Sequence, residues 1–126
     1  MKPIITDTDY NTLKSVVLHL SPTQKTKEVV QLMEELTRVR VIKDKEITPD
    51  VIRIDSYFEV AEENGKHVFK FTLTLPSNAN IMEKKISVLS PLGIALIGFK
   101  EGMTIDCALP AQNKKFKILK VVNQSK

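Results

Sequence analysis

The side chains that most often carry catalysis or bind metals are few and scattered in this sequence. His19 and His67 fall in different predicted elements, and neither has an acid or a thiol at ligand spacing, so we interpret both as surface or cap residues. Cys107 is the single cysteine, which excludes an internal disulfide and a cysteine-based zinc site within one chain. It lies on the apolar side of a predicted strand, where a small buried hydrophobe is the simplest interpretation. We therefore expect no catalytic residue, no metal site and no cofactor.

Paired carboxylates can hold Mg²⁺ or act as acid and base. The sequence has three such pairs, and each has a simpler explanation: a helix N-terminus, a solvated helix face, and the flank of a turn. They are Asp7/Asp9, Glu34/Glu35 and Glu62/Glu63. The four glycines are scattered and form no phosphate-binding loop. These observations favour a binding or interaction protein over an enzyme.

The C-terminal tail is the one strongly basic segment of a chain whose net charge is +4. It carries five lysines and no acidic residue: Lys114, Lys115, Lys117, Lys120 and Lys126. Such a strip, if exposed, attracts phosphate or an acidic protein surface. We favour a solvated face of a terminal strand and keep a nucleic-acid-binding module as an alternative.

Size and composition indicate a small protein that needs neither a disulfide nor a metal for stability. The chain has 126 residues, of which 42% are hydrophobic, enough for one compact domain or a small domain with an appendage. Residues 1–7 contain no apolar signal region, and no apolar run approaches the ~20 residues needed to span a bilayer. We expect a cytoplasmic protein without membrane contact.

Apolar residues recur at helical spacing in the first half of the chain. The two stripes consist of Leu13, Val16, Val17 and Leu20, and of Val29, Met33, Leu36 and Val39. Asp7 or Thr8 can cap the first helix, and the second begins with a capping box at residues 21–24 or with Thr26. The short turn between them predicts an antiparallel helical hairpin in residues 1–47, with helices of ~20 and ~30 Å.

Residues 48–126 show the alternation that is typical of strands. We predict strands from the alternation at residues 52–55 and 69–75 and at residues 86–89, 103–109 and 116–122, with Asn64-Gly65 as a hairpin turn between the first two. A short buried helix follows Ser90, which can cap it, with Pro91 in its first turn. The sequence therefore predicts an α+β fold in which the helical hairpin precedes a largely antiparallel sheet with one short helix.

One segment resembles a known family. The run Ile86-Ser-Val-Leu-Ser-Pro-Leu-Gly-Ile-Ala-Leu-Ile-Gly-Phe-Lys-Glu-Gly102 is similar to the signature of the Gre-type C-terminal domain, in which a strand leads into Ser-Pro and a short helix with Ala-Leu-Ile-Gly. The resemblance covers roughly residues 48–123 and implies an FKBP-like curved antiparallel sheet. The first half is similar, more loosely, to the Rnk-type nucleoside diphosphate kinase regulators of this superfamily.

The resemblance implies a transcription regulator that binds RNA polymerase near its secondary channel. Gre factors place acidic residues at the tip of a long coiled coil, where they hold a metal ion and promote transcript cleavage. The expected tip here, residues 19–27, is short, contains no carboxylate and carries Lys25 and Lys27, so we expect no cleavage activity. Carried over by position, the polymerase contact falls on Ser90, Pro91 and Leu92.

Two alternatives stay open beside this interpretation. A peptidyl-prolyl isomerase is suggested only by the FKBP-like fold, and the chain has no Trp to form the base of such a pocket. A nucleic-acid-binding module using Lys114, Lys115, Lys117 and Lys120 would bind in a strongly salt-dependent way. The oligomeric state is not predicted.

Overall fold

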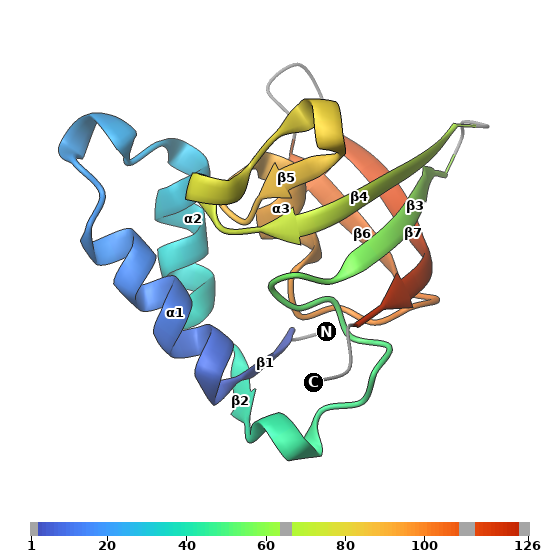
Figure 1. Ribbon diagram of the computed structural model, residues 1–126, viewed down its shortest axis with the longest axis horizontal. Helices are drawn as coiled ribbons and strands as arrows, with labels where there is room; N and C mark the ends of the chain where they lie inside the picture. Colours follow the sequence, from blue (N-terminus) through green and yellow to red (C-terminus); the bar gives the residue numbers. More distant parts are fainter. Residues whose placement is uncertain (1–2, 64–66, 109–112, 124–126) are drawn as a thin grey trace.

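The computed structural model describes residues 3–63, 67–108 and 113–123. They form an α+β structure in which two helices lie at one side of a curved sheet (Figure 1). The predicted α+β class is confirmed. The predicted hairpin turn at Asn64-Gly65 lies outside the described residues.

The N-terminal part runs strand, helix, helix, strand. Its elements are β1 (Ile4–Thr6), α1 (Asp7–Leu18), the 3₁₀ turn η1 (Pro22–Gln24), α2 (Lys27–Leu36) and β2 (Arg40–Ile42). Thr6 caps α1 by accepting a hydrogen bond from the Asp9 amide at 3.1 Å, so the expected caps at Asp7 or Thr8 are wrong by one or two residues. Thr26 caps α2 by accepting a hydrogen bond from the Val29 amide at 3.3 Å, which confirms one of the two predicted starts of this helix.

Helix α2 is shorter than the sequence pattern suggested. It ends at Leu36, which makes it ~15 Å long, half the predicted length. Residues 40–42, of which Val41 and Ile42 are β-branched, form β2 instead, and this strand pairs in parallel with β1. The buried stripe of α2 also differs from the prediction: Leu32 is 2% exposed, whereas Met33 is 42% exposed.

The main sheet has five strands in the order β5-β4-β3-β7-β6. Their bounds are Tyr57–Glu62 for β3, Val68–Thr74 for β4, Lys85–Ser87 for β5, Thr104–Ala108 for β6 and Asn113–Val122 for β7. The β4–β5 pair is parallel, because the intervening loop with its turns η3 (Pro76–Asn78) and η4 (Ile81–Glu83) brings the chain back beside Thr72, so that β5 pairs with the last residues of β4. The expectation of antiparallel neighbours is therefore wrong at that pair and right at the other three.

The first strand of this sheet starts later than predicted. Residues 54 and 55 form a turn in which Asp55 has a φ of 75° and the Ser56 amide donates to the Arg53 carbonyl at 3.0 Å, and β3 begins only at Tyr57. The alternation of Ile52 and Ile54 with Arg53 and Asp55 is thus not a strand. Ile52 is instead held by the α3 region, since its amide donates to the Phe99 carbonyl at 2.9 Å.

A bulge shifts the two faces of β7. The register with β3 passes from Glu59↔Lys120 to Val60↔Ile118, which leaves Leu119 as an extra residue. Ile118 and Val121 therefore both point into the core, while Leu119 is 42% exposed. The carboxylate of Glu101 accepts a hydrogen bond from the Val121 amide at 2.9 Å and steadies the strand just beyond the bulge.

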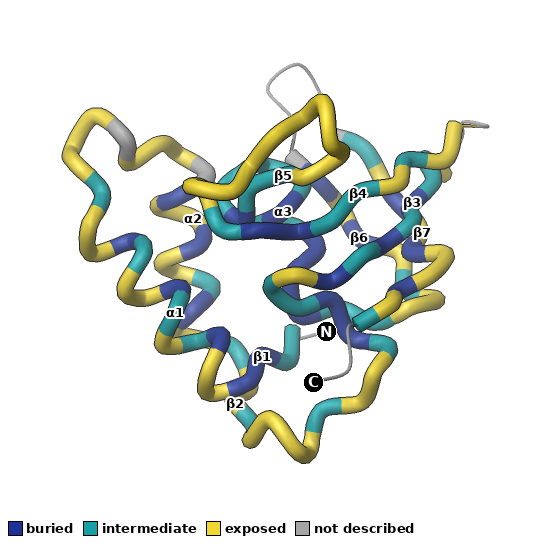
Figure 2. The backbone as a smooth tube through the Cα atoms, viewed as in Figure 1, coloured by how far each residue is buried: buried dark blue, intermediate teal, exposed yellow. Residues whose placement is uncertain are grey.

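The short helix α3 (Pro91–Leu96) lies within the curve of the sheet and completes the core. One continuous apolar cluster joins sheet residues such as Phe58, Leu73 and Ile118 to Leu13 of α1 and Leu32 of α2. Figure 2 shows buried residues in α1, α2 and α3 and along the strands of the sheet. The division at residues 47 and 48 into two folding units stays a prediction.

Candidate functional site

The turn into α3 positions the three residues that the sequence singled out. Ser90 Oγ accepts a hydrogen bond from the Gly93 amide at 3.1 Å and donates one to the Ser87 carbonyl at 2.7 Å. Pro91 occupies the first turn of the helix, where its missing amide hydrogen costs nothing. Ser90, Pro91 and Leu92 are all half-buried, so each keeps part of its surface accessible. The predicted cap is confirmed, and the predicted partner contact stays a prediction.

Gly93 explains why this turn follows the spacing Ser-Pro-x-Gly. A Cβ at this position would lie 2.4 Å from the Ser87 carbonyl oxygen and 3.0 Å from Ser90 Oγ. Only glycine lets the end of β5 approach the helix this closely. The spacing thereby fixes the angle at which α3 leaves the sheet and presents Pro91.

Cys107 lies under the same turn. Its Sγ is 3.7 Å from the Pro91 carbonyl oxygen, and the residue is buried. Burial raises the pKa of the Cys107 thiol above its ordinary value, so the reactive thiolate is disfavoured. The interpretation of Cys107 as a small buried hydrophobe is confirmed.

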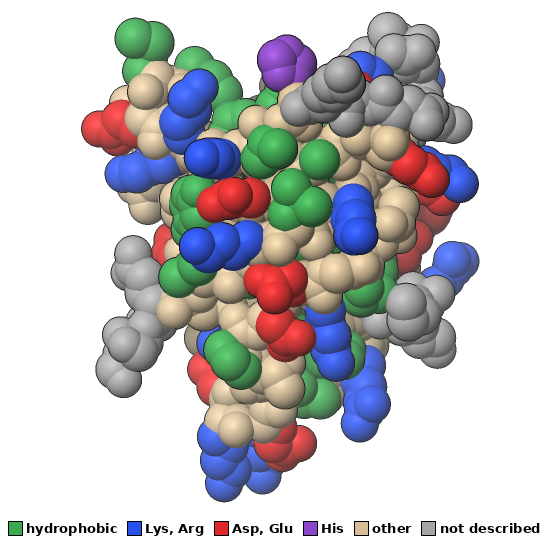
Figure 3. Space-filling model, turned by 90° about the vertical axis from the view of Figure 1, so that its right-hand side faces the viewer, with side chains coloured by type: hydrophobic (Ala, Val, Ile, Leu, Met, Phe, Trp, Pro, Cys, Tyr) green, Lys and Arg blue, Asp and Glu red, His purple; other side chains and the backbone are tan. Residues whose placement is uncertain are grey.

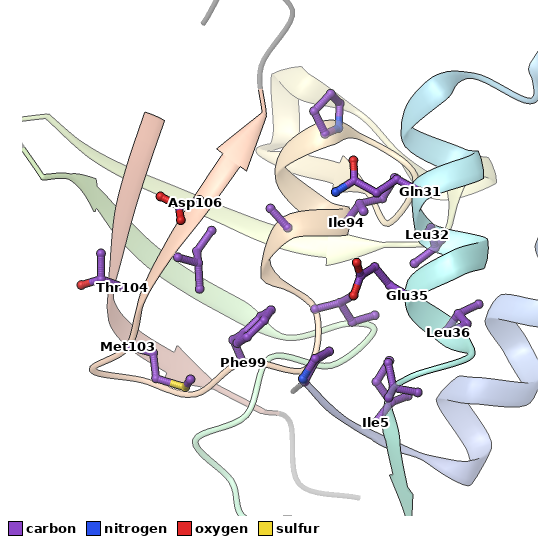
Figure 4. A pocket seen from close by; sticks show the side chains of 16 residues that line it. Ile5, Gln31, Leu32, Glu35, Leu36, Ile94, Phe99, Met103, Thr104 and Asp106 are labelled. Carbon is purple, nitrogen blue, oxygen red and sulfur yellow. The ribbon is translucent and has the colours of Figure 1, made fainter. Parts of the chain in front are cut away.

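A groove of about 340 Å³ runs beside the turn, between α2, α3 and β6. Figure 4 shows Gln31 and Glu35 pointing from α2 towards α3, with Ile94, Phe99 and Met103 along the groove. Pro91 belongs to the lining, and so do Thr104, Ile105 and Asp106 of β6. Periodicity could not reveal this groove, because its α2 wall is distant in sequence from the walls that α3 and β6 provide.

Glu35 and Asp106 are the two charged side chains among the residues that line the groove. Within the described part of the chain, neither makes a hydrogen bond or an ion pair. In a chain of net charge +4, the groove is therefore a local acidic region.

The predicted basic strip does not form an uninterrupted patch. Lys114 Nζ lies 2.9 Å from Glu62 Oε1, and the register places Lys115 opposite Asp106 and Lys120 opposite Glu59. Lys117 is exposed without an acid opposite it. Figure 3 shows basic and acidic side chains interspersed on the side that lies to the right in Figure 1. Lys126 lies outside the described residues.

A partly buried polar network, which sequence reasoning missed, joins α1 to the segment before β3. Asp9 Oδ2 accepts from Arg53 Nε at 3.4 Å and from the Ile54 amide at 3.3 Å. Burial raises the pKa of Asp9 above its ordinary value, against the opposing effect of Arg53. Asp44 accepts from Thr8 Oγ1 at 2.8 Å, which lowers the pKa of Asp44. The pair Asp7/Asp9 is thus divided, with Asp7 exposed and Asp9 buried.

The two histidines match the sequence interpretation of surface or cap residues. His19 ends α1, with its Nδ1 2.7 Å from the Ser15 carbonyl, and His67 is exposed beside Phe69. Lys25, between the helices, and Lys27, the first residue of α2, are exposed. In residues 3–63, 67–108 and 113–123, no three His, Cys, Asp or Glu side chains lie close enough together to hold a metal ion.

None of the helices in the described ranges is both long enough and apolar enough to cross a lipid bilayer.

The curved sheet, the Ser-Pro turn and the short helix inside the sheet define a protein of the Gre class. The family model described as transcription elongation factor, GreA/GreB, C-term, matches residues 47–123, and the chain belongs to this family. The resemblance seen in the sequence is thereby confirmed.

Curated relatives match the chain over about three quarters of its length. The transcription elongation factor GreA of Clostridium novyi is 34% identical over 93 residues, which cover 74% of this chain and 58% of the relative. GreA of Caldanaerobacter subterraneus is 33% identical over 74% of this chain and 59% of its own length. The matched part of the chain thus spans less than two thirds of these relatives.

Solved structures match nearly the whole chain. A prokaryotic transcription elongation factor GreA/GreB from Nitrosomonas europaea superposes with a TM-score of 0.78 and 28% identity, over 98% of this chain and 99% of that one. GreA factor homolog 1 of Thermus thermophilus shares the fold at a TM-score of 0.52 and 17% identity, over 98% of this chain and all of that one.

Proposed function

We propose that this protein is a transcription regulator that binds RNA polymerase near its secondary channel and does not stimulate transcript cleavage. The observation that carries the proposal is the GreA/GreB match over residues 47–123. It is supported by relatives named as transcription elongation factors and by a structural neighbour of almost equal length. RNA polymerase is cytoplasmic in bacteria, so the proposal places the protein there.

The polymerase contact in this proposal is the turn Ser90–Leu92. Its three side chains are half-buried, so they can hold α3 in place and still meet a partner. The cap hydrogen bonds and the close approach at Gly93 make the turn rigid, which lowers the entropy cost of binding. We further propose that residues 48–126 form an FKBP-like unit that presents this turn, with residues 1–47 as an antiparallel helical hairpin beside it.

The absence of cleavage activity is proposed from the chemistry of the turn between α1 and α2. Binding Mg²⁺ for phosphoryl chemistry needs carboxylates. Residues 19–27 contain none, and Lys25 and Lys27 are exposed there. The helices are ~18 and ~15 Å long, so the helical pair is also short. A cleavage assay on stalled elongation complexes should show no gain over the intrinsic rate.

The test is binding to purified core RNA polymerase, with a GreA protein as competitor. We expect micromolar or tighter binding that GreA displaces. The double variant Ser90→Ala, Pro91→Ala should bind at least tenfold more weakly. Thr26→Ala is the matched control, because it removes a helix cap of similar worth, about 1 kcal/mol, from α2 and leaves the proposed contact intact.

Three results would contradict this proposal in different ways. No binding would break the link between family and function, and binding without competition would move the contact away from the channel. A folded double variant that binds as well as the wild type would show that Ser90 and Pro91 are not the contact. A prolyl-isomerisation assay and a salt titration with nucleic acid test the two alternatives on the same preparation.

A further inference from the structure

We propose that the exposed edge of β6, together with the groove beside it, binds an extended peptide segment of a partner protein in which apolar residues alternate with lysine or arginine. The segment would add to the main sheet as a sixth strand. This inference rests on the sheet edge, the groove and its charges, and not on the proposed contact with RNA polymerase.

Strand β6 ends the sheet order β5-β4-β3-β7-β6, so β7 covers only one of its two sides. Ile118 donates its amide hydrogen to the Met103 carbonyl at 2.9 Å, which sets the alternation of the ladder. Ile105 and Cys107 then direct their main-chain groups towards β7, and Thr104 and Asp106 direct theirs away from it. In the described ranges, no hydrogen bond outside the β6–β7 ladder uses the main chain of Thr104 or Asp106.

The two faces of this edge differ in polarity. Ile105 is 7% exposed and faces the apolar groove, which Ile94 and Phe99 also line. Thr104 and Asp106 are exposed, and Figure 4 shows both on the side of β6 that faces away from α2. An added strand would place every second side chain over the groove beside Ile105 and the others beside Thr104 and Asp106. An alternating sequence fits this arrangement.

The charges select a basic partner. Glu35, on the α2 wall, and Asp106, on the strand edge, are the charged side chains of the lining, and both lack a hydrogen-bond or ion-pair partner in the described part of the chain. Lys115 lies opposite Asp106 in the ladder, yet no ion pair within 4 Å joins them. Lysine or arginine in the added strand would meet Asp106 on the outer face, and the carboxylate of Glu35 on the groove side adds to the negative potential that attracts a basic segment. The same carboxylates disfavour phosphate-rich ligands.

The experiment uses the full chain and a fluorescein-labelled peptide, acetyl-Lys-Val-Lys-Ile-Lys-Val-Lys-amide. Fluorescence anisotropy measures affinity, and amide hydrogen exchange followed by NMR locates the site. We expect saturable binding and at least tenfold slower exchange at Thr104 and Asp106. The Ile86 amide, on β5 at the opposite edge of the sheet, is the internal control and should not change.

Two control peptides separate strand addition from burial of apolar side chains alone. One carries N-methyl groups on its apolar residues and the other on its lysines, so that together they block both hydrogen-bonding registers. At least one should lose binding. Equal binding of both would show that the groove holds apolar side chains without a sixth strand, and the proposal would be wrong.

Two protein variants test the edge and the charges. Thr104→Pro removes an amide that faces away from β7, a position at which an edge strand tolerates proline, and should weaken binding at least tenfold. Glu35→Gln combined with Asp106→Asn should weaken it at least fivefold and flatten its salt dependence. Glu59→Gln, on the outer face of β3, is the matched control and should leave affinity unchanged. If Thr104→Pro does not fold, the charge variant decides.

Other occupants of the edge would give different results. Protection of Thr104 and Asp106 that rises with protein concentration in the absence of peptide would identify a second copy of this chain as the occupant. Absence of peptide binding up to millimolar concentration, or protection confined to amides outside β6, would overturn the proposal.

Discussion

The helical part contacts the rest of the molecule through two interfaces of opposite chemistry, which we call the α1 seam and the α2 seam. At the α1 seam, hydrogen bonds join β1 to Gly98, which follows α3, and join Asp9 of α1 to Arg53 and Ile54 in the segment before β3. At the seam between α2 and α3, apolar side chains face each other across a groove, and the carboxylate of Glu35 has no partner within the described residues.

The two seams have different roles: the α1 seam holds the helices in place, and the α2 seam leaves a groove accessible. Directional hydrogen bonds at the α1 seam fix where the helices sit, since each bond requires a particular distance and angle. The α2 seam then need not be filled to keep the helices in place. A groove can therefore stay accessible between α2 and β6 while the core behind it is continuous.

The largest expected effect is at Gly98, where the α1 seam begins. Its carbonyl accepts from the Ile4 amide at 2.9 Å, its φ is +88°, and a Cβ there would lie 2.6 Å from Pro3 Cβ. We expect Gly98→Ala to lower the free energy of unfolding by about 3 kcal/mol, from backbone strain and the displacement of β1. Urea unfolding followed by circular dichroism measures it.

Gly102→Ala is the matched control for that change. Gly102 has a similar φ of +92°, but a Cβ at this position would meet nothing within 4 Å, so strain alone should cost about 1 kcal/mol. Equal losses for the two variants would mean that β1 does not depend on the close approach at Gly98, and the α1 seam would be weaker than its geometry implies.

The second effect concerns the buried carboxylate. Asp9→Ala leaves the Ile54 amide and the Arg53 guanidinium without their shared acceptor, and we expect a loss of about 2 kcal/mol, because Arg53 is 26% exposed and can still reach water. Asp7→Ala, at the start of the same helix but exposed, should cost about 0.5 kcal/mol. Similar losses of unfolding free energy for the two variants would mean that the hydrogen bonds of Asp9 contribute no more than an exposed carboxylate at a helix N-terminus.

The sequence predicted those features that depend on residues close together in the chain. The caps at Thr26 and Ser90, the helix after Pro91 and the inward parity of Ile105 and Cys107 depend on neighbouring residues, and the structure confirms them. Contacts between distant segments decided the rest. Asp9 meets Arg53 across 44 residues, and parallel pairing with β1 draws residues 40–42 out of a helical pattern. The groove depends on the same long-range packing, which no local periodicity encodes.

A smaller effect is the response of the α1 seam to pH. The folded-state pKa of Asp9 is raised by burial, whereas the unfolded value is about 3.9. Between these values the unfolded chain binds fewer protons than the folded one, so the Asp9 contribution to stability is full below about pH 3.9 and is lost as pH rises through the folded pKa. The stability of the wild type minus that of Asp9→Asn should therefore fall over this window and then level off. A difference that is constant or rises with pH would show that Arg53 outweighs burial.

The smallest effect should come from the other seam. Glu35 is half-buried on the groove wall, and its side chain makes no hydrogen bond or ion pair in the described part of the chain, so Glu35→Ala removes no contact of this kind from the folded state. We expect a change in unfolding free energy within about 0.5 kcal/mol, of either sign. Glu62→Ala is the control, because Glu62 pairs with Lys114 at 2.9 Å and should lose somewhat more. A loss at Glu35 as large as that at Asp9 would mean that both seams hold the helices in place, and the groove would then be a structural joint and not an open surface.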